Sequence, residues 1–351
     1  MTISHNIYIH VPFCMSKCNY CAFFSTACAN PDWKKYSNDI CRELVFWSNK
    51  LGKIQIPTVF FGGGTPSLMP IWAFEQIMQC VNDNFKVLPN CEITLESNPG
   101  TLDKDKLKDF VSIGVNRLSV GVQSLKDEEL LFLGRKHNVK QALDLLKNAI
   151  EMNLRVNADF IYGLPNHNEK SVIELCKSIN ELGLSHVSMY ELTIEKNTPF
   201  GKMNLNMPNN DTMAQMYNAI PEYLSLPRYE VSNYAKPGYE CKHNQNIWNG
   251  DAYIGVGRGG AGRVFLNNIW YEQRGNNELF EPISNETRAI EKILTGLRTI
   301  RGVKLTDDVK SIINFDWINS HKDLVEINNE YLYATAKGLL ILDDLTVDLI
   351  K

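Results

Sequence analysis

Near its start, the chain has a short apolar run that leads directly into a cysteine-rich loop. The stretch reads Tyr8-Ile9-His10-Val11-Pro12-Phe13-Cys14-Met15-Ser16-Lys17-Cys18-Asn19-Tyr20-Cys21-Ala22-Phe23-Phe24. Three residues separate Cys14 from Cys18, and two separate Cys18 from Cys21. Thiolates on so short a loop can converge on one iron–sulfur cluster or on one metal ion.

The number of cysteines in this loop predicts a cluster with one open iron. A [4Fe–4S] cluster usually takes four thiolates, so three leave one iron free to bind a small molecule. The alternative is a structural zinc site, in which His10 or Cys28 supplies the fourth ligand. The uneven spacing differs from that of a zinc finger, and a loop that directly follows a strand favours the cluster.

Six apolar runs alternate with helical patterns, which predicts parallel strands with helices outside them. We expect the strands at Ile7–Val11, Thr58–Phe61, Glu92–Ser97, Arg117–Gly121, Arg155–Ile161 and His186–Tyr190. The helices are expected at 32–50, 71–82, 104–113, 127–133, 139–152 and 169–182. This alternation predicts an α/β fold built on a partial (β/α)6 TIM-like barrel.

The strand–helix rhythm stops after Tyr190. The following residues predict an irregular extension, with a helix near 211–223 and a Gly-rich loop at 255–260. A shorter, helix-rich pattern begins near Asn285 and predicts a small C-terminal domain. We therefore expect a barrel at 1–200, an extension at 201–284 and a C-terminal domain at 285–351.

Polar and glycine residues follow the predicted strands at their C-terminal ends, where the functional groups of such barrels gather. The glycine run Gly62-Gly63-Gly64-Thr65 would let a backbone approach a ligand closely, although a tight turn explains it equally. Carboxylates suit the ammonium of an amino-acid-like ligand, and an arginine suits its carboxylate, although such residues are also common as structural polar groups. The candidates are Glu96, Gln123, Arg135 and Asp159.

The composition is that of an ordinary globular protein, with 44% apolar and 22% charged residues. The 36 Lys and Arg against 40 Asp and Glu give a net charge of −4, which disfavours a nucleic-acid partner. The sequence contains no run of eighteen apolar residues and no recognisable secretory leader, so we expect a cytoplasmic protein.

A single histidine in the predicted extension is a candidate haem ligand. His243 lies in Cys241-Lys242-His243-Asn244-Gln245-Asn246-Ile247-Trp248. An imidazole near aromatic residues can ligate haem iron, although a lone histidine is more often a hydrogen-bonded structural group.

These motifs together resemble the radical S-adenosylmethionine superfamily, whose mark is C-x-x-x-C-x-x-C. More narrowly, the chain resembles the oxygen-independent coproporphyrinogen III oxidase group, and within it the haem chaperone branch, HemW. The resemblance covers nearly the whole chain and includes Tyr8 to Cys14, Phe60 to Ser67, Arg117 to Ser124, Asp159 to Pro165, Tyr190 to Thr193 and Tyr229 to Ala235.

The resemblance implies a [4Fe–4S] cluster on Cys14, Cys18 and Cys21, with S-adenosylmethionine at the open iron. Reduction of that complex would yield a 5′-deoxyadenosyl radical. The positions that match contacts to a first S-adenosylmethionine are Tyr8, Gly63 and Glu96. Those that match contacts to a second are Tyr20, Gly64, Thr65, Gln123, Arg135 and Asp159.

Two departures from the oxidases favour the haem chaperone branch. The oxidases carry a further cysteine two positions after the third, where this chain has Phe23, and they carry an extension ahead of the loop. The branch has an H-N-x-x-Y-W motif implicated in haem binding, in which this chain keeps His243 but has Ile247 for the tyrosine. Where the family reads G-A-H-S, this chain has Gly260-Ala261-Gly262-Arg263, without the histidine.

We therefore expect a haem chaperone that passes haem to an unidentified acceptor protein. The alternative is a coproporphyrinogen III oxidase, so whether the protein is an enzyme stays open, as does its oligomeric state. The resemblance leaves open a peripheral membrane contact through a respiratory acceptor. A radical tRNA modifier is disfavoured by the net charge and by the lack of an RNA-binding module.

Overall fold

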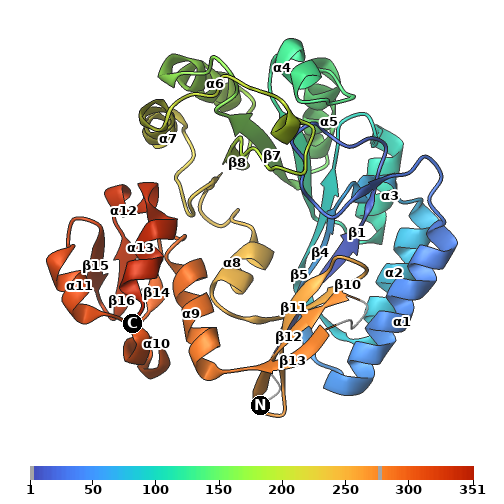
Figure 1. The fold of residues 1–351 in the computed structure, drawn as a ribbon. Helices are drawn as coiled ribbons and strands as arrows, with labels where there is room; N and C mark the ends of the chain where they lie inside the picture. Colours follow the sequence, from blue (N-terminus) through green and yellow to red (C-terminus); the bar gives the residue numbers. More distant parts are fainter. Residues whose placement is uncertain (1–3, 276–278) are drawn as a thin grey trace.

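The fold, in a computed structural model that describes residues 4–275 and 279–351, is built on one large sheet (Figure 1). The sheet has eleven strands in the order β13-β12-β11-β10-β1-β4-β5-β6-β7-β8-β9. The six predicted strands are neighbours and pair in parallel, which confirms the α/β class and the partial barrel. They are β1 (His5–Val11), β4 (Gln55–Gly63), β5 (Lys86–Ser97), β6 (Arg117–Gln123), β7 (Arg155–Tyr162) and β8 (His186–Glu191).

Helices follow the strands on the outer side of the sheet, as the apolar periodicity predicts (Figure 1). Side-chain caps set several of their starts: Asp32 accepts from Lys35 N, and Asn138 and Asn168 each form a capping box. The helices are α1 (Trp33–Leu51), α2 (Ile71–Asn84), α3 (Lys104–Ile113), α4 (Asp127–Phe132), α5 (Val139–Glu151) and α6 (Glu169–Glu181). No helix in the described part of the chain is both long and apolar enough to span a bilayer.

The extension after β8 is more regular than its sequence predicts. It contains α7 (Asn210–Tyr223), which is confirmed, and a second helix, α8 (Lys242–Trp248). Its strand β10 (Ala252–Val256) pairs in parallel with β1, and the Gly-rich segment predicted as a loop therefore begins inside a strand. The remaining strands are antiparallel additions at the two ends of the sheet: β9 (Asn233–Ala235), β11 (Ala261–Leu266), β12 (Ile269–Arg274) and β13 (Leu279–Ile283).

The C-terminal part has a hydrophobic core of its own, which supports a domain boundary near residue 285. That boundary, and the one at 200/201, remain proposals. This part is helix-rich, as predicted, and also holds a small antiparallel sheet of order β14-β16-β15. Its elements are α9 (Asn285–Gly296), α10 (Asp307–Ile312), α11 (Phe315–Ser320), α12 (Ala336–Leu340), α13 (Leu342–Leu349), β14 (Val303–Lys304), β15 (Val325–Asn328) and β16 (Tyr331–Ala334).

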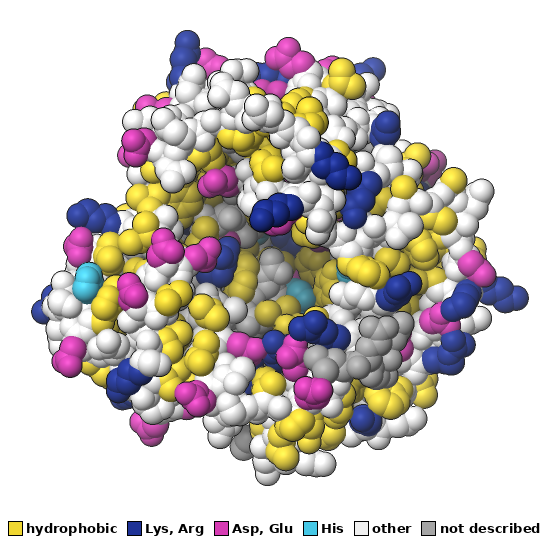
Figure 2. All heavy atoms as spheres, viewed as in Figure 1, with side chains coloured by type: hydrophobic (Ala, Val, Ile, Leu, Met, Phe, Trp, Pro, Cys, Tyr) yellow, Lys and Arg dark blue, Asp and Glu magenta, His cyan; other side chains and the backbone are white. Residues whose placement is uncertain are grey.

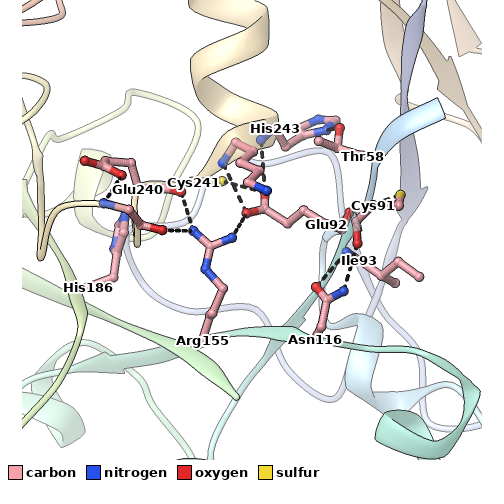
Figure 3. A network of polar contacts seen from close by, with 12 residues as sticks. Thr58, Cys91, Glu92, Ile93, Asn116, Arg155, His186, Glu240, Cys241 and His243 are labelled. Atoms are coloured by element: carbon pink, nitrogen blue, oxygen red, sulfur yellow. Dashed lines mark hydrogen bonds and ion pairs between the residues drawn. The ribbon is translucent and has the colours of Figure 1, made fainter. Parts of the chain in front are cut away.

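A buried carboxylate joins α8 to the strands of the barrel (Figure 3). Glu92 of β5 accepts hydrogen bonds from the first two amides of α8, Lys242 N at 3.2 Å and His243 N at 3.0 Å. It also pairs with Arg155 of β7 at 2.8 Å, and its side chain is fully buried. A negative charge at a helix N-terminus satisfies amides that have no partner within the helix. Glu92 therefore fixes α8 against the barrel.

Replacing Glu92 with alanine tests this role. The change removes the ion-pair partner of Arg155 and the acceptor of two helix amides, so we expect the free energy of unfolding to fall by about 3–5 kcal/mol. Urea unfolding measures it. The control is Glu151→Ala, which breaks an exposed ion pair with Lys104 and should cost less than about 1 kcal/mol. Equal losses in the two variants would contradict the role of Glu92.

Candidate functional site

The cysteine loop is closed at its base by a short strand pair. β2 (Phe13–Cys14) pairs in parallel with β3 (Thr26–Ala27), and Cys28 N donates to the Cys14 carbonyl at 2.9 Å. Within the loop, the Lys17 ammonium donates to the Phe23 carbonyl at 3.2 Å. All three cysteines of the loop are free thiols. The loop is thus a folded unit that presents its thiols on one side.

A histidine on β1 connects the barrel interior to this loop. His10 Nδ1 lies 3.0 Å from the Tyr8 hydroxyl, and His10 Nε2 lies 2.8 Å from the carbonyl of Phe24. Burial, followed by the charge of Glu96, raises the pKa of Tyr8, so its hydroxyl keeps its proton. The sequence prediction included Tyr8 but missed His10, whose hydrogen bond to the Phe24 carbonyl holds the loop in place.

The glycine run lies directly against the cysteine loop. Gly64 N donates to Val11 O at 2.7 Å, and Thr65 N donates to Phe13 O at 2.8 Å. A Cβ at Gly64 would lie 2.6 Å from Phe13 O and 3.0 Å from Cys14 Sγ, so only glycine fits. Gly63 has a φ of 113°, a conformation that favours glycine.

One pocket gathers most of the predicted residues from five different strands and their loops. The predicted residues that line it are Cys14, Cys18, Tyr20, Cys21, Gly63, Gly64, Glu96, Gln123, Arg135 and Asp159. Thr65 lines the neighbouring pocket, which also contains Cys18 and Arg135. The convergence expected from barrel geometry is therefore present, although Tyr8 and His243 are not among the residues that line this pocket.

Two carboxyl groups in this pocket have pKa values above their usual range. Burial, followed by the nearby charge of Asp159, raises the pKa of Glu96 to about 8. Burial also raises the pKa of Asp159, against the effect of a hydrogen bond from Asn157 at 2.7 Å. Glu96 accepts a hydrogen bond from Gly63 N at 3.0 Å. Because two nearby carboxylates repel each other, a cationic or hydrogen-bond-donating ligand would relieve this site.

Arg135 reaches the cysteine loop from the segment between α4 and α5. Its guanidinium donates to Gly121 O at 2.7 Å and to Cys18 Sγ at 3.4 Å. It also donates to Asn98, whose amide donates to the Thr65 hydroxyl at 2.9 Å. The sequence prediction missed this bridging function of Asn98. A signal was available, because Asn98 opens the Asn-Pro-Gly turn two residues after Glu96.

Gln123 is placed by an irregularity at the end of β6. The register between β6 and β7 shifts between Gly121 and Gln123, and Gln123 has a φ of 72°. Positive φ is uncommon for a residue other than glycine and is concentrated at functional sites. This kink turns the Gln123 side chain into the pocket that holds the cysteines.

His243 lies at the base of the barrel, buried from solvent. Its Nδ1 is 2.7 Å from the Thr58 hydroxyl, and its ring packs on Phe60 with centroids 5.0 Å apart. The other ring nitrogen, Nε2, is buried and has no hydrogen-bond partner among the described residues. Burial and the charge of Arg117 lower the pKa of His243 to about 3, so the ring is neutral and able to ligate a metal.

The loop and the glycine run fit an iron–sulfur cluster by their donor chemistry. Three free thiols border one pocket, and the absence of a side chain at Gly64 leaves space beside Cys14. Thiolates are the usual ligands of such clusters. Among the described residues, no three His, Cys, Asp or Glu side chains are arranged to hold a single metal ion.

The sequence matches the Radical SAM superfamily over residues 8–179. Heme chaperone HemW of Escherichia coli strain K12 is 37% identical over 268 residues, covering 74% of this chain and 70% of the relative. Heme chaperone HemW of Synechocystis is 33% identical over 330 residues, covering 84% and 78%. That of Lactococcus lactis is 29% identical, covering 97% and 93%.

The fold is shared with a solved structure, the coproporphyrinogen III oxidase HemN of Escherichia coli, a radical SAM enzyme. The TM-score is 0.83, at 19% identity, over 99% of this chain and 90% of that chain. The fold, the cysteine pocket and the sequence relatives agree. The chain therefore belongs to the HemW haem chaperone family, and its residues 8–179 match the radical SAM superfamily.

Proposed function

We propose that this protein is a haem chaperone that carries a [4Fe–4S] cluster with S-adenosylmethionine and passes haem to an acceptor protein. The observation that best supports the proposed cluster is the pocket in which three free thiols lie beside the glycine run and buried carboxyl groups. Haem as the cargo is supported by relatives named heme chaperones, at 30–37% identity.

Cys14, Cys18 and Cys21 would hold three irons of the cluster, and S-adenosylmethionine would complete the fourth. When bound, this group supplies one-electron reduction. Arg135 lies 3.4 Å from Cys18 Sγ and is a ready hydrogen-bond donor to a thiolate. The closed base of the loop and the bond from His10 to Phe24 hold the thiols in place.

The residues proposed to bind S-adenosylmethionine differ in their position around the pocket and in the hydrogen bonds that they already make. Glu96 uses one carboxylate oxygen on Gly63 N, which leaves the other for the amino group of a ligand. Asp159 and Gln123 line the same pocket from the neighbouring strands. Tyr8 lies close enough to Glu96 to feel its charge, while Tyr20, Gly64 and Thr65 border the space beside Cys18 and Arg135. Arg135 would position Asn98 and Thr65 as well as contact a carboxylate.

His243 is proposed as the haem ligand through its unpartnered Nε2. In the folded state described above, this nitrogen is covered, because the ring packs on Phe60 and α8 is tied to Glu92. Haem ligation would therefore require α8 to leave its place at the base of the barrel. The hollow on the face shown in Figure 2, in the region where α8 lies in Figure 1, supports an approach from this side.

One residue, Phe23, makes the oxidase function less well supported than the haem chaperone function. The oxidases carry a further thiol at the position of Phe23, which here lines the cysteine pocket with 69% of its surface exposed. The likeness to HemN, at 19% identity, extends to the fold alone.

We further propose that the acceptor is a separate haem protein and that the chaperone acts in the cytoplasm, in peripheral contact with a membrane where a respiratory acceptor is embedded.

Serine substitutions in the loop test the cluster. We expect anaerobically reconstituted wild-type protein to hold about four iron and four sulfide per chain. Cys14→Ser, Cys18→Ser and Cys21→Ser should each lose most of the iron and the visible absorbance of the cluster. Cys28→Ser is the matched control, because Cys28 borders the same loop but not its pocket. Full iron in the three variants, or stoichiometric zinc in the wild type, would contradict the cluster.

Two substitutions at His243 separate ligation from packing. Both His243→Ala and His243→Gln remove the ligand, whereas glutamine can keep a hydrogen bond to Thr58. We expect each variant to raise the Kd for haem by about tenfold or more, equivalent to about 1.4 kcal/mol, with an unchanged cluster spectrum. Haem titration followed by absorbance measures this. Wild-type affinity in the glutamine variant would assign His243 a structural role only.

A further inference from the structure

Two free thiols outside the candidate site face each other where α1 packs on α2. Cys41 lies on α1 and Cys80 on α2, and both are half-buried. By contrast, Cys91, Cys176 and Cys241 are buried thiols. Nothing in the proposed haem chaperone function uses the α1–α2 pair.

The register of the two helices brings the thiols together. Ser37 of α1 donates to Gln76 of α2 at 2.9 Å, and Cys41 and Cys80 each lie one helical turn further along their helix. Cys80 Sγ is 3.6 Å from Cys41 O, and Cys41 Sγ is 3.8 Å from Gln76 O. On the far side of the pair, Ser48 donates to Asn84 O at 2.8 Å. Hydrogen bonds therefore fix the helices on both sides of the pair.

The two thiols are chemically unequal. The interaction between the two thiols lowers the pKa of Cys41 and raises the pKa of Cys80. Cys41 also borders an open groove along α1, together with Asn38 and Arg42. A thiolate is the nucleophile in cysteine chemistry, so Cys41 is the reactive member of the pair.

We propose that Cys41 and Cys80 form an oxidisable dithiol, whose disulfide joins α1 to α2 when the protein meets a peroxide. The Cys41 thiolate attacks one peroxide oxygen, the O–O bond breaks, and a sulfenic acid and water result. The Cys80 sulfur then attacks the Cys41 sulfur, the S–O bond breaks, and water leaves with the Cys80 proton. Each peroxide is reduced to two waters as two thiols become one disulfide.

The position of the pair gives the modification a structural consequence. α1 follows the cysteine loop, and α2 follows the glycine run through a short 3-10 turn at Pro66–Leu68. Cys41 and Cys80 are 39 positions apart in the sequence, and closing a loop of this length restricts the unfolded chain. The disulfide would therefore stabilise the part of the fold from which both loops project.

Peptide mapping after mild oxidation tests the proposal. Full-length protein, purified anaerobically with reductant and then freed of it, is treated with hydrogen peroxide, alkylated and digested without reduction. We expect a linked peptide pair containing Cys41 and Cys80, with both thiols lost together and about tenfold faster than buried Cys176. The oxidised protein should also melt at a higher temperature than the reduced protein.

Single variants identify the order of events. In Cys80→Ala, Cys41 should remain as a sulfenic acid that dimedone traps, and the melting temperature should no longer rise. In Cys41→Ala, Cys80 should remain a thiol. If Cys41 and Cys80 stay fully alkylatable after peroxide has oxidised the loop cysteines, or if each pairs with another cysteine, the proposal is wrong.

Discussion

Two backbone hydrogen bonds between the end of β4 and the cysteine loop determine the geometry of the candidate site. They run from Gly64 N to Val11 O and from Thr65 N to Phe13 O, at 2.7 and 2.8 Å. They form only because Gly64 has no side chain, since a Cβ there would lie 2.6 Å from Phe13 O. The pocket that holds the three thiols, Glu96 and Asp159 depends on this close approach.

The strand–helix rhythm predicts the barrel well because each of its parallel strands is a buried apolar run that ends at a clear turn. The ends of those strands also predict the pocket, because barrel topology brings their following loops to one face. Cys14, Glu96, Gln123 and Asp159 meet there as expected.

The strands of the extension could not be predicted in the same way. β10 to β13 are short, and β11, β12 and β13 pair antiparallel at the end of the sheet. Their extended conformation depends on pairing with β1 and with one another. Gly255 lies in β10 although glycine is disfavoured in strands; a Cβ there would lie 2.2 Å from Ala261 O of the next strand. Tertiary contact, rather than local preference, decides these elements.

His243, at the base of the barrel, combines features of a structural residue with features of a metal ligand. Glu92, Arg155 and Thr58 hold α8 and its histidine in a buried polar network, as a structural residue would be held (Figure 3). Its Nε2 nevertheless has no partner among the described residues, and the burial that lowers its pKa keeps it unprotonated. A buried neutral imidazole with one unpaired nitrogen is costly to the fold, and that cost lowers the free energy needed to move α8 away from the barrel.

Anaerobic haem titration of the reconstituted protein, paired with a coproporphyrinogen III turnover assay, tests the haem chaperone function most directly. The account predicts saturable haem binding, transfer of that haem to an added apo-haem protein, and no protoporphyrinogen IX from coproporphyrinogen III. Formation of protoporphyrinogen IX without saturable haem binding would contradict it and would make the protein an oxidase.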